Sequence, residues 1–326
     1  MRDLFKQIGW RMWLVSAAAV MAYPGASAAG RWFTVDSQHY GVGTDVSQEF
    51  TRLVAQHMEA IYKEYERRFQ GYALKEHGRF QVKVYAREED YNAAVPPAVK
   101  GSSGAFVSAD RLLAAFREGR TDEVVFRTLY HEGFHQFLFN RVSADVPLWI
   151  NEGFAEYFAE ATWNGRDFTT GQVPWVRVHV LKEALKGGTY IPLSRLFLMQ
   201  ADDWLASVRA DESQASVQYC EAWSVVHFLL HARGGRYRAR ALGYLGLIAE
   251  GMDYDRAFQE SFGSNVEGFE RAWRQYAMTL EPGPEDVCSK NMEVVAFVAL
   301  RYYGDMDRFT SLERMRRDLQ DSNRLE

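Results

Sequence analysis

The stretch His131-Glu132-Gly133-Phe134-His135 decides how the rest of the chain is interpreted. Residues four positions apart on an α-helix differ by about 40° in direction and about 6 Å in height, so both imidazoles can bind one metal ion. Glu132 points about 100° away from His131 and is better placed to take a proton from an activated water than to bind the metal. The stretch therefore predicts a helix with a zinc site, in which His131 and His135 are ligands and Glu132 is the general base.

A third ligand is expected from residues 147–157, which read P-L-W-I-N-E-G-F-A-E-Y. A catalytic zinc site has three protein ligands and an open fourth position. Pro147 suits the first turn of a helix, and the short connection 142–146 lets this helix fold back against the first. Glu152 would then face the histidines, and Glu156, one turn later, could accept the second N–H of a ligating imidazole. The segment therefore predicts Glu152 as the third ligand and Glu156 as a supporting group.

A second histidine pair, His227 and His231, has the same spacing of four on another expected helix. No acidic residue accompanies this pair in the pattern of the first motif, and Trp223, Val226 and Phe228 mark the helix as part of the core. We therefore expect the second pair to pack in the interior rather than to bind a metal.

Hydrophobic periodicity predicts an α+β chain that is predominantly α. Apolar residues recur at three and four positions from Asp45 to about Gln70, which indicates a long helix. The segment 80–85 alternates as a strand does, and 101–107 reads as a turn that leads into a second strand. Further helices are expected near 122–140, 147–161, 174–186, 216–232, 236–250 and 266–279.

We expect one metallopeptidase-like domain over residues 30–282. Its α+β part, 30–119, would offer an edge strand to a cleft, and its helical part, 120–282, would carry the zinc site. A Gly-Pro-rich stretch ends this body, and residues 283–326 are expected to be a C-terminal helical extension of unknown role.

The N-terminal 28 residues are expected to be a secretory signal peptide. Basic residues precede the apolar run 12–22, and Ala26-Ser27-Ala28 is typical of a cleavage site. A retained membrane anchor is the alternative, but Pro24 and Gly25 cut the run below the roughly 20 residues that span a bilayer. The mature chain is therefore expected to be periplasmic or secreted, without a stable membrane span.

Composition and cysteine content limit the remaining possibilities. With 326 residues, 47% of them hydrophobic, the chain can bury a large core. The net charge of −5 and the lack of a basic stripe with interleaved aromatics give no indication of nucleic-acid binding. Cys220 and Cys288 could form a disulfide in an oxidising compartment or remain two separately buried thiols. The oligomeric state is not indicated.

The two motifs together resemble the gluzincin metallopeptidases, which share a thermolysin-like catalytic core. Within that group they are most similar to the peptidase MA-like domains, many of which have no known function. The resemblance is specific over residues 128–160 and loose over 78–280. It implies the same zinc ligands and the same general base that the helical spacing indicates.

A later segment, Tyr219 to Leu229, is similar to a further helix of that group. The resemblance implies that Tyr219 donates a hydrogen bond to the oxyanion of the tetrahedral intermediate, and a phenol aimed at that charge is physically sensible. A packing role for Tyr219 stays open. Sixteen residues separate His135 from Glu152, fewer than in the best-known gluzincins, so the loop between the helices must be tight.

The implied activity is hydrolysis of amide bonds in a peptide or protein substrate. The chain has no G-x-M-E-N segment, which argues against an aminopeptidase. Two alternatives remain open. One is a non-catalytic, zinc-containing binding protein of the cell envelope that holds a peptide or protein partner in the cleft, and the other is a hydrolase of a different amide.

Overall fold

The computed structural model describes residues 31–70, 78–142, 146–284 and 286. Within them the chain is α+β and predominantly helical, as predicted. The expected signal peptide, Cys288 and the C-terminal extension beyond residue 286 lie outside the described residues. The other cysteine, Cys220, is buried.

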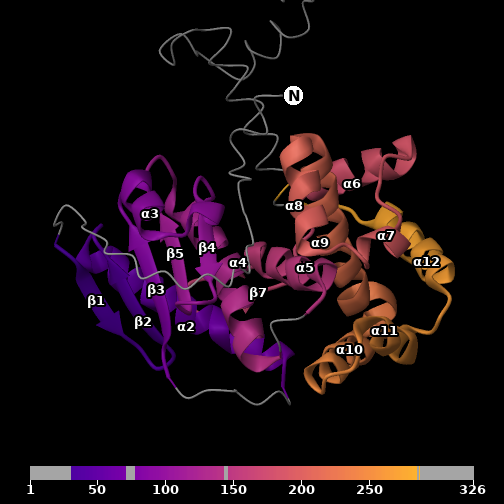
Figure 1. Ribbon diagram of the computed structural model, residues 1–326, viewed down its shortest axis with the longest axis horizontal. Helices are drawn as coiled ribbons and strands as arrows, with labels where there is room; N and C mark the ends of the chain where they lie inside the picture. Colours follow the sequence, from indigo (N-terminus) through magenta and orange to yellow (C-terminus); the bar gives the residue numbers. More distant parts are fainter. Residues whose placement is uncertain (1–30, 71–77, 143–145, 285, 287–326) are drawn as a thin grey trace, which may run out of the picture.

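A five-stranded mixed sheet forms the first part of the fold (Figure 1). In spatial order its strands are β1 (Phe33–Asp36), β2 (Tyr40–Thr44), β3 (Phe80–Tyr85), β5 (Leu112–Phe116) and β4 (Gly104–Val107). The three central strands are parallel, and both edge strands run antiparallel to their neighbours. The edge strand β4 is the expected second strand, whereas β1, β2 and β5 were not predicted. Strand β5 has the sequence L-L-A-A-F, a continuous apolar run without the alternation that reveals a strand.

Most of the remaining described residues lie in helices. They are α2 (Gln48–Arg68), α3 (Glu88–Ala94), the short 3₁₀ turn η1 (Pro97–Val99), α4 (Asp122–Arg141), α5 (Leu148–Ala159), α6 (Trp175–Gly187), α7 (Leu193–Leu196), α8 (Ala201–Ala210), α9 (Glu212–Gly235), α10 (Arg238–Ala249), α11 (Tyr254–Phe262) and α12 (Val266–Thr279). A two-stranded hairpin, β6 (Thr162–Trp163) with β7 (Phe168–Thr169), follows α5. Every helix expected between residues 45 and 279 is present. Helix α9 begins four residues earlier than predicted, because the Asp211 side chain accepts a hydrogen bond from the Ser213 N–H and caps it.

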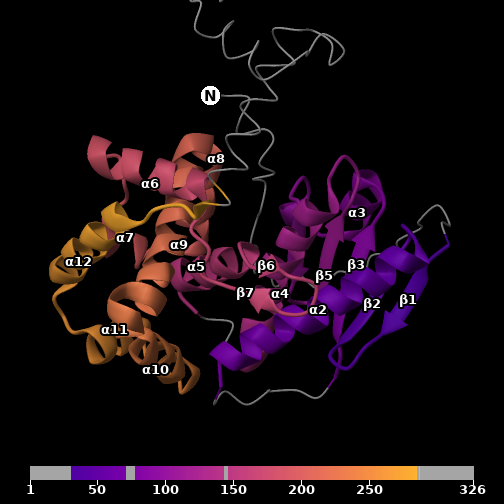
Figure 2. The same ribbon diagram turned by 180° about the vertical axis from the view of Figure 1, so that it is seen from behind.

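The predicted histidine helix, α4, occupies the middle of the molecule (Figure 1). Thr121 caps its N-terminus, and Asp122 and Glu123 place negative charge in the first turn, where the helix dipole favours it. Helix α2 lies along one face of the sheet and also packs against α4 (Figure 2). The side-chain amide of Gln136 donates to the carbonyls of Gln81 and Arg111, which ties α4 to the sheet.

The helices α4, α5 and α9 stack in that order, and α5 packs closely against both neighbours. Gly153 makes the contact between α5 and α9 possible, because a Cβ at this position would lie 2.4 Å from the Ala222 carbonyl oxygen. At Gly133, between α4 and α2, a Cβ would lie 2.9 Å from the Met58 methyl group, the end of a flexible side chain that can shift. Gly153 is therefore the motif glycine that sets how closely two helices approach.

No helix within the described residues is long and apolar enough to cross a membrane.

Candidate metal centre

Three ligand atoms converge between α4 and α5. His131 Nε2 lies 2.9 Å from His135 Nε2. Glu152 Oε2 lies 3.3 Å from the first of these nitrogens and 3.8 Å from the second. In the described part of the chain, these three side chains are the group whose ligand atoms gather closely enough to hold a metal ion. Both imidazoles therefore direct the same nitrogen, Nε2, toward one point.

The ligand group is buried and fits a cation. His131, His135 and Glu152 are 1%, 3% and 1% exposed. Among the described residues, neither carboxylate oxygen of Glu152 has a hydrogen-bond partner. A buried carboxylate without a partner is costly, and coordination of a cation removes that cost. The donor set of two imidazoles and one carboxylate therefore suits a bound metal ion.

Electrostatics keep both histidines neutral. Burial, reinforced by the charge of Arg177, lowers the pKa of His131 well below its ordinary value. Burial also lowers the pKa of His135 to about 4, against the hydrogen bond that its Nδ1 donates to Asn151 Oδ1, which raises it. Burial and the neighbouring carboxylates raise the pKa of Glu152. A neutral imidazole carries the lone pair that a metal needs, and a metal ion would favour the ionised form of Glu152.

Polar side chains lie behind each imidazole. Asn151 Oδ1 lies 2.8 Å from His135 Nδ1, and Glu156 Oε1 lies 3.5 Å from His131 Nδ1. The His135 contact is a hydrogen bond, whereas His131 Nδ1 has no hydrogen-bond partner among the described residues and lies at ion-pair distance from the Glu156 carboxylate. An acceptor or a negative charge beside Nδ1 favours the ring form that carries its proton there and presents an unprotonated Nε2. The rings are therefore oriented from both sides, as metal-ligating histidines usually are.

The carboxylate of Glu132 does not join the three ligand atoms but contacts the edge strand β4. Its Oε2 accepts a 2.8 Å hydrogen bond from the main-chain N–H of Phe106 on β4. Burial raises the pKa of Glu132 to about 8, although the Phe106 hydrogen bond acts in the opposite direction. A carboxylate whose pKa lies near neutrality can take up a proton and give it back.

Tyr219 approaches the site from α9. Its ring packs edge to face on Trp204 of α8, with the centroids 5.6 Å apart. Burial, followed by the charge of Glu152, raises the pKa of the Tyr219 phenol well above its ordinary value. The phenol therefore keeps its proton and remains a hydrogen-bond donor within electrostatic range of the third ligand.

A chain of buried charges continues away from Glu156. Arg177 on α6 donates through Nη2 to Glu156 Oε2 and through Nε to Glu160 Oε1, the latter at 2.7 Å. Arg127 on α4 donates through Nη2 to the same Glu160 oxygen. Arg177 and Glu160 have side chains only 3% and 8% exposed, whereas Arg127 is 41% exposed. The chain of charges therefore runs from the surface to the imidazole of His131.

The second histidine pair packs as expected. His227 Nδ1 lies 2.8 Å from the Tyr276 hydroxyl, and His231 Nε2 lies 3.0 Å from the Tyr157 hydroxyl. The two rings stack with their centroids 4.4 Å apart. Ordinary hydrogen bonds and stacking thus account for this pair.

Three groups at the site were not anticipated. Asn151 stands next to Glu152 in the motif, and its amide could have been recognised as a partner for a histidine. Arg177 sits in the apolar segment W-V-R-V-H-V-L, where a single arginine on a buried helix signals an ion pair. Phe106 contributes a main-chain N–H, which no side-chain pattern reveals.

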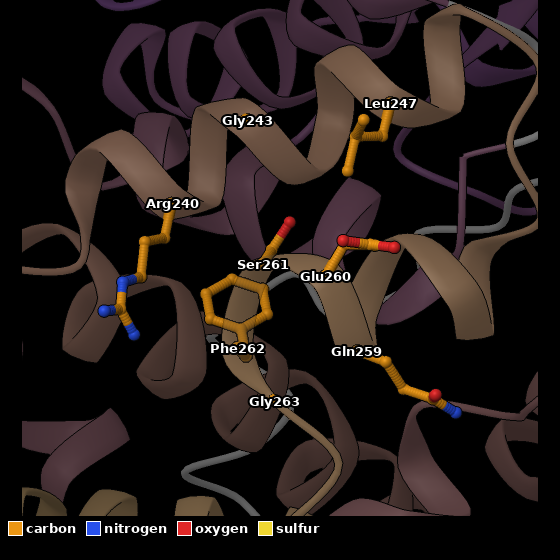
Figure 3. A pocket seen from close by; sticks show the side chains of 8 residues that line it. All are labelled: Arg240, Gly243, Leu247, Gln259, Glu260, Ser261, Phe262 and Gly263. Atoms are coloured by element: carbon orange, nitrogen blue, oxygen red, sulfur yellow. The ribbon is translucent and has the colours of Figure 1, made fainter.

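A surface pocket lies between α10 and α11, away from these groups (Figure 3). It is lined by Arg240, Gly243, Leu247 and residues 259–263. None of the lining residues belongs to the helices that carry the motif. This pocket therefore has no part in the metal centre.

Part of the chain matches the model of a protein family. Residues 125–239 are similar to a family described as a protein of unknown function (DUF1570). No curated protein matches the chain. The matched part contains His131, Glu132, His135, Glu152, Glu156 and Tyr219. The description of that family names no activity.

Proposed function

We propose that the protein is a zinc-dependent metallopeptidase of the gluzincin type that acts outside the cytoplasm on a peptide or protein. The observation that carries the proposal is the convergence of His131 Nε2, His135 Nε2 and Glu152 Oε2 within 4.8 Å of one another. Two histidines and one glutamate are the ligand set of several catalytic zinc sites, which keep a fourth position for water or substrate.

The balance of buried charges around the site favours a bound divalent cation. Glu156 and Glu160 are paired with arginines. In the described part of the chain, Glu132 and Glu152 have no Lys or Arg partner, and the neighbouring imidazoles are neutral. Two unpaired carboxylates in a buried site are neutralised by one ion of charge +2, which makes the ionised form of both acceptable.

The residues around the ligands have separate roles in amide hydrolysis. A zinc ion in such a site activates water and polarises the substrate carbonyl. Glu132 accepts the proton of the attacking water and returns it to the leaving amine. Tyr219 donates a hydrogen bond to the oxyanion that develops on the substrate.

One observation favours a second candidate function. The six predicted site residues are each at most 5% exposed, so they offer little accessible surface to a large substrate. A protein that keeps this arrangement closed would use the metal as a structural element and bind a peptide or protein partner without turnover. Hydrolysis is the measurement that separates the two functions.

The test compares wild type with Glu132→Gln on a mixed fluorogenic peptide library. Glu123→Gln is the matched control, because Glu123 is an exposed glutamate on the same helix. The peptidase proposal expects cleavage by wild type and by the control, with kcat/KM about 10²- to 10⁴-fold lower in Glu132→Gln at unchanged zinc content. Full activity in Glu132→Gln would refute the role of Glu132. Zinc without cleavage in wild type would support the binding function.

A further inference from the structure

We propose that Arg177 is a positioning residue for the metal centre, acting on His131 through the carboxylate of Glu156. The inference rests on the proposed metal site and concerns a side chain that touches none of the three ligands in the contacts described above. Helix α6, which carries Arg177, would then contribute to the affinity of the site for the metal.

The two carboxylate oxygens of Glu156 face different side chains. Oε2 accepts a hydrogen bond from Arg177 Nη2, while Oε1 lies 3.5 Å from His131 Nδ1. Both side chains that hold this carboxylate are almost fully buried, so its orientation is fixed by them and not by solvent. The guanidinium therefore decides which oxygen faces the imidazole.

The orientation of Glu156 has a consequence at the opposite side of the ring. A carboxylate charge 3.5 Å from Nδ1 favours the ring form that carries its proton on Nδ1 and the lone pair on Nε2, and Nε2 is the atom of His131 that faces the other ligands. His131 Nδ1 has no hydrogen-bond partner among the described residues, so a Glu156 carboxylate that turned away would remove this charge without a replacement. Arg177 thus favours the form of His131 that binds a metal.

Arg177 is itself held in place by a second carboxylate. Its Nε donates to Glu160 at the end of α5, and Glu160 is held in turn by Arg127 of α4. The guanidinium fork can reach Glu156 and Glu160 at once, whereas the single ammonium group of a lysine is not pre-organised to do so. The charge chain therefore joins α6 to the two helices that carry the ligands, and it requires arginine rather than positive charge alone.

The test is the affinity for zinc, measured by competition with a chromogenic chelator, in wild type, Arg177→Met, Arg177→Lys and Glu156→Gln. We expect Arg177→Met and Glu156→Gln each to weaken zinc binding about 10- to 100-fold, the usual effect of removing a group behind a metal ligand. Arg177→Lys should recover part of the loss. Arg240→Met is the control, because Arg240 is an exposed arginine on α10 outside the charge chain, and this variant should bind zinc within about twofold of wild type.

A double variant, Glu156→Gln with Arg177→Met, separates positioning from general loosening of the fold. If Arg177 acts through Glu156, the double variant binds zinc no more weakly than Glu156→Gln alone, and the absorption bands of bound Co²⁺ shift in the same way in both. The inference would be overturned if the double variant lost zinc affinity by the product of the two single losses. It would also be overturned if Arg177→Met bound zinc as tightly as wild type, and both outcomes would leave the metal site intact. If Arg177→Met does not fold, Arg177→Lys with Glu156→Gln completes the same cycle. Absence of zinc from wild type would instead remove the proposed function.

Discussion

The main-chain N–H of Phe106 donates a 2.8 Å hydrogen bond to the carboxylate of Glu132, which joins the edge strand β4 to the middle of α4. The bond fixes one oxygen of the carboxylate at the boundary between the sheet and the ligand-bearing helices. Burial nevertheless raises the pKa of Glu132 to about 8. The structure thus combines a fixed position with a proton affinity near neutrality, and both suit a general base.

This raised pKa predicts how pH affects the stability of the metal-free protein. A carboxyl whose folded-state pKa lies above its unfolded value stabilises the fold fully below the unfolded pKa, and that contribution is lost as pH rises through about 8. Burial lowers the pKa values of His131 and His135, so these histidines change the stability of the fold only below pH 6.5. Between pH 6.5 and 8, the buried carboxylates of the site therefore dominate the pH dependence of stability.

We expect Glu132→Gln to raise the melting temperature of the metal-free protein at pH 8 more than at pH 5.5. The amide keeps an oxygen that can accept the Phe106 N–H but never ionises. Thermal denaturation in the presence of a chelator measures the difference. An equal change at both pH values would contradict the pKa assigned to Glu132.

Tyr219 provides a test of oxyanion stabilisation. We expect Tyr219→Phe to lower kcat about 10²- to 10³-fold, the usual effect of removing one such donor, while zinc content and melting temperature stay near those of wild type. The phenylalanine ring keeps the edge-to-face contact with Trp204, so packing is preserved. Unchanged kcat would leave Tyr219 with a packing role only.

Gly153 provides a test of the close approach between α5 and α9. The added methyl group of Gly153→Ala would meet the Ala222 carbonyl oxygen at 2.4 Å, which forces the two helices apart. We expect a loss in the free energy of unfolding of about 1–3 kcal/mol, measured by chemical denaturation. Gly243→Ala on α10 is the control, because nothing lies within 4 Å of the added methyl group, and it should be neutral or stabilising.

The two histidine pairs should respond differently to substitution. His227→Ala removes a buried ring and its hydrogen bond with Tyr276, so we expect a loss of roughly 2–4 kcal/mol in the free energy of unfolding. Zinc content, measured by atomic emission on the folded fraction, should be unchanged. Loss of zinc from this variant would show that the second pair takes part in metal binding.

Sequence patterns were sufficient where the chemistry is local. The spacing of His131 and His135 fixes their shared direction on a helix, and Glu152 follows on the next helix after a short connection. The α+β class follows in the same way from helical periodicity and from the alternation in β3. These features depend on neighbours within a few turns of the chain.

The contacts that depend on distant segments could not be predicted. The partner of Glu132 is a main-chain N–H on β4, and strand pairing decides which N–H faces it. Arg177 reaches Glu156 only because α6 packs against α9, which also packs against α5, and no local pattern encodes that arrangement. Strand β5 was missed because its apolar side chains are buried on both faces, which removes alternation.

The most direct test of the central claim is the zinc content of five purified proteins, measured by atomic emission after dialysis against metal-free buffer. The account predicts about one zinc per chain in wild type and in Glu132→Gln. It predicts strong depletion in His131→Ala, His135→Ala and Glu152→Ala, each shown to be folded by circular dichroism. Full zinc content in any of the three ligand variants, or none in wild type, would contradict the assignment of the site.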